Sequence, residues 1–112
     1  MKKYQIIYTD PPMSDKELFS VADEFRKGVL GKRTSKNWCY AISAPLAGYL
    51  EFCGYQCELV KGFIGDYEHY WIVLLDGRIL DPTADQFNDN MPRIYIGKQP
   101  SNYEVESDIE LI

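Results

Sequence analysis

The chain has 112 residues, 46% of them hydrophobic, and it is rich in aromatic residues, with nine Tyr, five Phe and two Trp. This apolar content excludes a disordered chain, and the length predicts one domain spanning residues 1–112. The net charge of -5, with no basic run beyond Lys32 and Arg33, argues against a nucleic-acid partner. No apolar stretch reaches the length of a secretory leader or a membrane span, and three cysteines make no disulfide framework, so we expect no membrane partner and a cytoplasmic protein.

The N-terminal third predicts a short strand and a helix. The apolar stretch at 4–8 favours a strand. Ser14 and Glu17 then form a capping-box pattern, in which each side chain accepts from the backbone of the other residue. Apolar residues follow at helical spacing, and Gly31 is a suitable C-terminal stop. We therefore expect a helix over 15–30.

A second helix is expected over 38–53, because its apolar residues recur at helical spacing up to Gly54. Pro45 lies inside this segment. Proline costs about 3 kcal/mol in a helix interior, since it removes a backbone donor and clashes with the preceding turn. The sequence therefore predicts either a kink or a late start for this helix.

The rest of the chain has the pattern of strands. We expect strands over 56–64, 69–75, 78–81 and 93–97. Asp76-Gly77 marks a hairpin between the second and third of these strands. Residues 98–112 are acidic and are expected to be irregular. Helices followed by an antiparallel meander give an α+β fold, with the N-terminal helices packed on the sheet.

The sequence predicts a thiol nucleophile, a general base and a carboxylate that orients the base, namely Cys39, His69 and Asp81. Cys39 falls at a predicted helix start, where unpaired N–H groups and the helix dipole stabilise a thiolate and can donate to an oxyanion. His69 is the only histidine in the chain, and it can take the thiol proton and return it to a leaving group. Asp81 can fix the imidazole tautomer. Each residue alone has a commoner structural role, so the combination carries the hypothesis.

The hairpin loop decides whether Asp81 can reach His69. With a two-residue loop, Asp81 would lie opposite Ile72 and point to the other face of the sheet. A three-residue loop ending at Gly77 would instead place Asp81 opposite Trp71. Asp81 would then share a face with His69. The catalytic hypothesis therefore requires the three-residue loop or a bulge.

Three short segments carry a family resemblance. They are Asn37-Trp38-Cys39-Tyr40-Ala41-Ile42 at a helix start, His69-Tyr70-Trp71-Ile72-Val73 on a strand, and Asp81-Pro82-Thr83. In this order they resemble the transglutaminase-like and papain-like cysteine hydrolases, and the continuation Ala84-Asp85-Gln86-Phe87 resembles small bacterial and phage members. The resemblance covers roughly residues 37–87. It implies a papain-like core, no cofactor, and peptide or carboxamide hydrolysis, deamidation or acyl transfer through a thioester on a peptide or protein substrate.

The sequence departs from this family beside the thiol. Large transglutaminases usually carry Gln directly before the nucleophile, where this chain has Trp38. Papain-like enzymes carry an upstream Gln as an oxyanion donor, and the only upstream Gln here is Gln5. We therefore expect Asn37 or backbone N–H groups to supply the oxyanion donors.

Four further residues are candidates for roles at or beside the substrate site. Trp38 and Trp71 could line an acyl pocket, although core packing is the favoured explanation for Trp71. Gln86 and Thr83 could orient Asp81 or a substrate amide, or they could cap a turn.

Other readings of the same residues remain open. Cys53 and Cys57 could bind a metal with His69, but no fourth ligand has a familiar spacing, so we expect no metal site. The fold could also serve as a non-catalytic binding or inhibitor module. A third reading is a small cysteine peptidase that needs a partner domain to capture its substrate.

Overall fold

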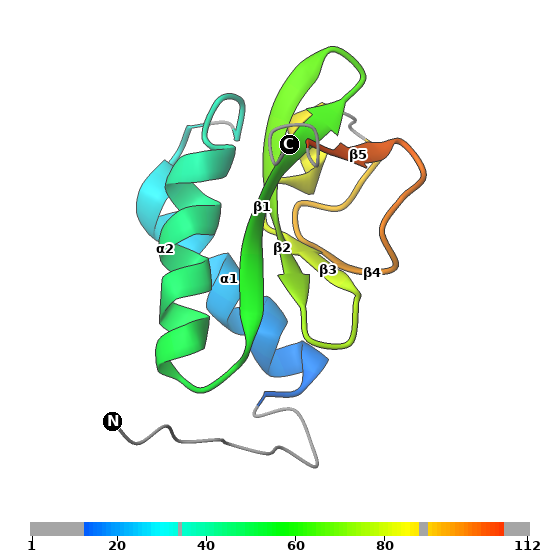
Figure 1. Cartoon of the computed structure of the whole chain (residues 1–112). Coiled ribbons are helices and arrows are strands. Elements are labelled where there is room, and N and C mark those ends of the chain that lie inside the picture. The colour runs from blue at the N-terminus through cyan, green and yellow to red at the C-terminus, as the bar shows by residue number, and fades with distance from the viewer. Residues whose placement is uncertain (1–12, 34, 88–89, 107–112) are drawn as a thin grey trace, which may run out of the picture.

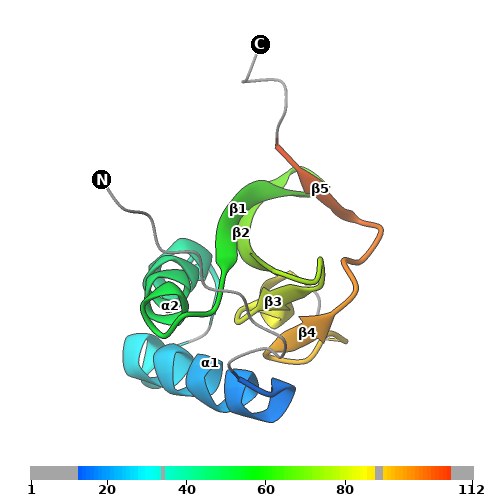
Figure 2. The ribbon, with the colours of Figure 1, turned by 60° about the horizontal axis from the view of Figure 1, so that its bottom comes forward.

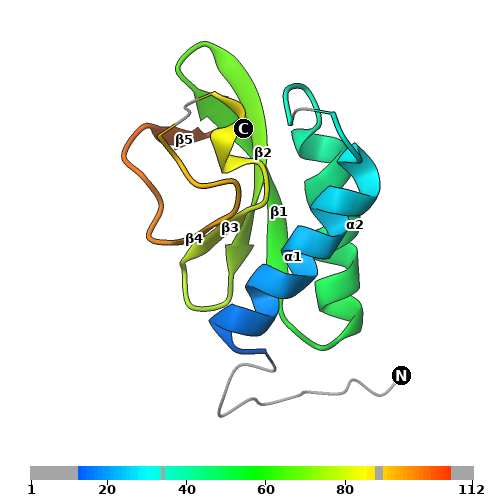
Figure 3. The same cartoon turned by 180° about the vertical axis from the view of Figure 1, so that it is seen from behind.

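The computed structural model describes residues 13–33, 35–87 and 90–106, so the predicted strand over 4–8 lies outside the described residues. Within these ranges the chain has the expected α+β architecture, with two α-helices and one five-stranded antiparallel sheet. Figures 1 and 3 show both helices on the same side of the sheet, with the sheet as the second layer.

Helix α1 spans Asp15–Leu30, as the capping pattern predicts. The Glu17 N–H donates to Ser14 Oγ at 3.2 Å, and the Ser14 N–H donates to Glu17 Oε1 at 2.9 Å, which completes the capping box. Gly31 ends the helix with φ 59, a left-handed value that favours glycine, and its N–H donates to the Lys27 carbonyl.

Helix α2 spans Cys39–Phe52 and continues through Pro45, so the predicted late start is wrong. The cost of the proline is offset by burial, because Ile42, Leu46 and Leu50 lie on the covered face and are fully buried. No helix in the described ranges is both long enough and apolar enough to cross a membrane.

The strands are β1 (Cys57–Ile64), β2 (Tyr67–Leu74), β3 (Ile79–Asp81), β4 (Tyr95–Gly97) and β5 (Tyr103–Val105). Their order in the sheet is β4-β3-β2-β1-β5. The expectation that the chain is irregular from residue 98 is wrong for β5, which pairs with the end of β1; residues 107–112 lie outside the description. A simple meander is also wrong, because β4 and β5 follow each other in the chain but occupy opposite edges (Figure 2).

The two faces of the sheet bury two separate apolar clusters. The cluster under the helices combines α1, α2 and the sheet; its sheet members include Ile72, Leu74 and Leu80. The other face buries Trp71, Ile79 and Tyr103. The alternation of side chains along β2 therefore sends Trp71 and Ile72 to different cores, and His69 shares the face of Trp71.

Candidate active site

Cys39 is the first residue of α2, where sequence reasoning placed a thiol beside unpaired N–H groups. The residue is 8% exposed and its thiol is free. The loop before it turns at Asn37, whose φ of 70 lies in the left-handed region that asparagine tolerates better than most residues. Trp38 then forms the N-cap without a side-chain hydrogen bond. Nothing from the cap side chain therefore occupies the first N–H groups of the helix.

The hairpin has the three-residue loop that the hypothesis required. Leu74 and Arg78 close it, with the Leu74 N–H donating to the Arg78 carbonyl at 2.8 Å, and Gly77 has φ 90. Ile72 pairs with Leu80, one position before Asp81, which confirms the register in which Asp81 lies opposite Trp71.

His69 and Asp81 are in direct contact. His69 Nε2 lies 2.7 Å from Asp81 Oδ2, and both side chains are fully buried. At this distance the imidazole and the carboxylate form a charge-assisted hydrogen bond, which fixes the ring and its tautomer. The carboxylate occupies Nε2, and Nδ1 is the nitrogen left for the thiol.

Asp81 is itself held by three further donors. Its Oδ1 accepts from the Thr83 N–H at 3.0 Å and from the Thr83 hydroxyl at 3.3 Å. The Tyr103 hydroxyl donates to Oδ2 at 2.7 Å. Thr83 therefore orients Asp81, which was one of the three roles open to it. Tyr103 is a site residue that sequence reasoning missed.

Cys39 and His69 shift each other's pKa values. Burial raises the pKa of the Cys39 thiol, but interactions with His69 and the backbone of Tyr70 outweigh it, so the net pKa lies below the ordinary cysteine value. Burial lowers the pKa of His69, but Asp81 and then Cys39 outweigh it and raise that pKa to about 9. Both shifts favour the charged forms, a thiolate beside an imidazolium, over the neutral pair.

A free strand edge lets the thiol reach this pair. On β2, β3 pairs only with Ile72 and Val73, so the first half of β2 has no β3 partner. The backbone of Tyr70 lies in that half and helps to lower the pKa of Cys39. Nδ1 of His69 is buried and has no hydrogen bond of regular geometry to the described residues.

Aromatic rings surround the imidazole. Its centroid lies 5.9 Å from Trp71, 5.4 Å from Phe87 and 5.8 Å from Tyr103. Trp71 is fully buried in the core on this face, so it packs against His69 and does not line a substrate pocket. Its predicted role as a pocket wall is therefore wrong, and the alternative of core packing is confirmed.

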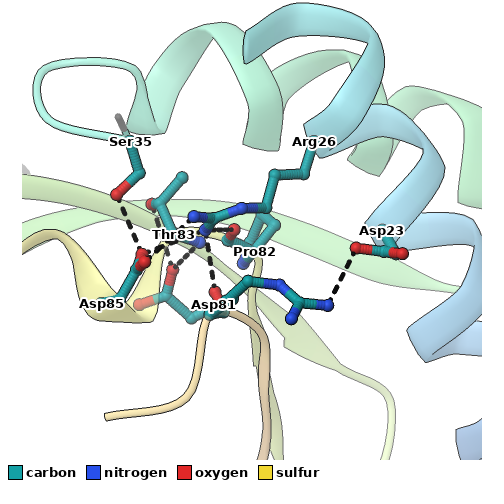
Figure 4. A network of polar contacts seen from close by, with 8 residues as sticks. Asp23, Arg26, Ser35, Asp81, Pro82, Thr83 and Asp85 are labelled. Carbon is teal, nitrogen blue, oxygen red and sulfur yellow. Dashed lines mark hydrogen bonds and ion pairs between the residues drawn. The ribbon is translucent and has the colours of Figure 1, made fainter. Parts of the chain in front are cut away.

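A cluster of polar contacts holds the chain after Asp81 (Figure 4). The Arg26 guanidinium on α1 forms two 3.0 Å hydrogen bonds with the Asp85 carboxylate and donates to the Pro82 carbonyl at 3.0 Å. The Ser35 hydroxyl also donates to Asp85, at 2.9 Å. Burial raises the pKa of Asp85, but Arg26 and Ser35 outweigh it and lower the net pKa. The carboxylate is thus kept charged, and Arg26 joins α1 to the segment that carries Asp81.

An open groove of about 330 Å³ gives access to the thiol. Cys39 lies in its wall with two carboxamides, one carboxylate and four aromatic rings: Asn37, Gln86, Glu68, Tyr40, Tyr67, Tyr70 and Phe87. Asn37 and Gln86 therefore lie where a substrate-binding role was expected. Trp38 does not line this groove; its ring lies 4.5 Å from the Arg33 guanidinium, a cation–π contact that accounts for its position.

The other two thiols have different surroundings. Cys57 is buried on β1, and its Sγ contacts the Ala47 carbonyl at 3.7 Å. Burial, with Glu51 and Glu58, raises its pKa to about 11. Across residues 13–33, 35–87 and 90–106, no three His, Cys, Asp or Glu side chains are grouped so that they could hold a metal ion.

Comparisons with known proteins gave no match: no protein-family model, no curated protein and no solved structure is similar to this chain. The resemblance of the three short segments to transglutaminase-like hydrolases therefore stays a prediction. A proposal about function therefore rests on the geometry around Cys39.

Proposed function

We propose that the protein is a cysteine-nucleophile enzyme that acts on an amide carbonyl, on a papain-like or transglutaminase-like core. The observation that carries the proposal is the buried His69, held by Asp81 on one side and coupled to the Cys39 thiol on the other. A nucleophile, a base and an orienting group in this relation are the requirements of nucleophilic catalysis.

The reaction follows from the charges of the pair. The Cys39 thiolate attacks the carbonyl carbon and forms a C–S bond, while the carbonyl π electrons move to oxygen. When this intermediate collapses, the C–N bond breaks and the His69 imidazolium gives its Nδ1 proton to the leaving nitrogen. The product is a thioester on Cys39. Water then releases an acid, as in peptide hydrolysis or deamidation, or an amine accepts the acyl group.

The surroundings of the groove support an uncharged acyl donor. Half of its lining residues are aromatic, and two of these, Tyr40 and Tyr67, are 56% and 63% exposed. Its one carboxylate, Glu68, lies 3.6 Å from the Lys61 ammonium, which partly offsets its charge. Peptide groups and carboxamide side chains are uncharged and match this lining.

Selective alkylation of the thiols tests the nucleophile. We expect iodoacetamide near neutral pH to modify Cys39 faster than Cys53 and Cys57, with each site quantified by peptide mass spectrometry, because only Cys39 is coupled to an imidazolium. Cys57, with its pKa near 11, is the internal control for a buried thiol of ordinary chemistry.

Turnover is tested with a peptide library. Mass spectrometry should show cleaved peptides, deamidated side chains or peptides joined to amines, and Cys39→Ala should abolish each product. If Cys39 reacts no faster than the other thiols and no library peptide changes, the enzyme proposal fails and the non-catalytic binding module is the better account.

A further inference from the structure

Gln86 carries a side chain that the fold does not use. It lies on the short 3₁₀ helix η1 (Ala84–Gln86), which has no side-chain cap hydrogen bond. Its Oε1 is buried without a hydrogen-bond partner among the described residues. An unpaired buried carbonyl oxygen costs about 1–3 kcal/mol, so a contribution to stability does not explain why glutamine is found at this position. Neither predicted structural role, capping the turn or orienting Asp81, is observed.

The backbone of Gln86 is nevertheless held tightly. Its N–H donates to the Thr83 carbonyl at 3.0 Å. Asp85, the residue before it, is fixed by Arg26 at 3.0 Å. The Phe87 ring after it lies 5.4 Å from the His69 ring. The segment is therefore positioned by contacts on both sides, and Gln86 lines the groove that contains Cys39.

We propose that the Gln86 Nε2–H group is the side-chain oxyanion donor of this site. This inference rests on the proposed function, since it concerns the oxygen that becomes negative when Cys39 attacks a carbonyl. Because Oε1 is buried, the proposal assigns the NH₂ end of the carboxamide to the groove. A donor fixed before the reaction stabilises the developing charge without reorganisation.

Asn37 is the competing donor, and its residue type has another explanation. It lines the same groove, but its φ of 70 requires a residue that tolerates the left-handed region. Its side chain is also exposed, and water weakens a hydrogen bond to an oxyanion. Gln86 has no such backbone requirement, because its helix is right-handed.

Two reactions at the same thiol separate the oxyanion donor from the nucleophile. Iodoacetamide alkylation displaces iodide and forms no oxyanion. Acylation by p-nitrophenyl acetate forms a tetrahedral oxyanion before the C–O bond breaks and p-nitrophenolate leaves, which absorbance follows directly. We expect Gln86→Ala to slow acylation of Cys39 about 100-fold or more and to leave its alkylation rate unchanged.

Gln56→Ala is the matched control, because Gln56 is exposed and lies in a different depression at the far end of β1. It should change neither rate. Gln86→Glu should slow acylation at least as much as Gln86→Ala, because a carboxylate repels the oxyanion.

The outcomes distinguish the two proposals. If Gln86→Ala is acylated as fast as the unsubstituted protein, the role of Gln86 is overturned. An equal fall in the acylation and alkylation rates would also overturn it, because it indicates that the substitution disturbs the thiol itself. If p-nitrophenyl acetate fails to acylate Cys39 in the unsubstituted protein while iodoacetamide alkylates it no faster than Cys57, the proposed function itself fails.

Discussion

Two hydrogen-bond donors share a single oxygen of Asp81. Tyr103 and His69 each lie 2.7 Å from Oδ2. The tyrosine therefore takes up part of the negative charge that would otherwise act on the imidazole. Tyr103 therefore acts on the imidazole through the Asp81 carboxylate.

Substituting Tyr103 by Phe should raise the pKa of His69 above its present value of about 9. The ring contacts with Trp71 and His69 would remain, and only the hydroxyl would be lost. The chain has a single histidine, so an NMR titration of its ring protons gives this pKa without assignment. We expect a stability loss of about 1 kcal/mol from the missing hydrogen bond.

Tyr95→Phe is the control for this substitution. The Tyr95 hydroxyl donates to the Lys98 carbonyl, outside the triad, so the pKa of His69 should not change. A lower pKa in Tyr103→Phe would mean that the hydroxyl mainly holds Asp81 in place, and would contradict the tuning role.

Residue types, their chain order and the local signals of three segments predicted Cys39, His69 and Asp81 as a set, and the structure places His69 beside Asp81. Tyr103 had no such signal. It lies on a strand of only three residues, in a segment with no periodicity, and it reaches Asp81 through the three-dimensional fold. Its role could not be derived from local pattern.

At the scale of elements, the approach of β5 to β1 depends on Gly62. A Cβ at this position would lie 2.2 Å from the Glu104 carbonyl oxygen and 2.4 Å from the Trp71 ring. Neither group can move freely, because one is backbone and the other is a fully buried ring. Glycine is therefore required where β5 brings Tyr103 to the site.

Gly62→Ala should destabilise the protein by about 1–3 kcal/mol through overpacking, and should weaken the Tyr103–Asp81 contact as β5 moves away. Urea unfolding measures the first effect, and the His69 titration measures the second. Gly48→Ala is a useful contrast. Gly48 is an exposed helix residue with open space at its Cβ, so alanine there should stabilise by about 1 kcal/mol. Equal effects of the two substitutions would contradict the packing argument.

The elements differ in how far the sequence determines them. The bounds of α1 follow from its cap and its glycine stop, and the β2–β3 register follows from the left-handed Gly77. The strand β5 pairs with a strand far back in the chain, and no short pattern encodes that choice of partner. No short pattern predicts the partner of Arg26 either. Its place in the sequence is typical of a surface residue of a helix, but its guanidinium bonds to Asp85.

At the scale of the whole molecule, protonation of His69 is coupled to folding. Burial lowers its pKa, but Asp81 and Cys39 raise it to about 9 in the folded protein, against 6.5 for an ordinary histidine. The folded state therefore binds this proton more tightly than the unfolded state. The resulting stabilisation is fully present below pH 6.5 and is lost as the pH rises through about 9.

Asp81→Asn should remove most of this effect. Both proteins in the comparison carry Cys39→Ala, so that the thiol does not titrate. We expect the loss of unfolding free energy caused by Asp81→Asn to be on the order of 2 kcal/mol larger near pH 6 than near pH 10. Cys39 also raises the His69 pKa and is absent from both proteins. The pH at which this stabilisation is lost should therefore lie below 9. Urea unfolding across this range measures the loss, and a constant value would contradict the coupling.

The distance in sequence between the members of the site has a consequence during synthesis. Cys39 leaves the ribosome first, and His69, Asp81 and Tyr103 follow over several seconds at ordinary rates of translation. Until then the nascent thiol has no imidazole beside it and no folded sheet to bury it. The chain thus carries an ordinary cysteine through much of its own production, and the interactions that lower the Cys39 pKa exist only once β2 has folded beside α2.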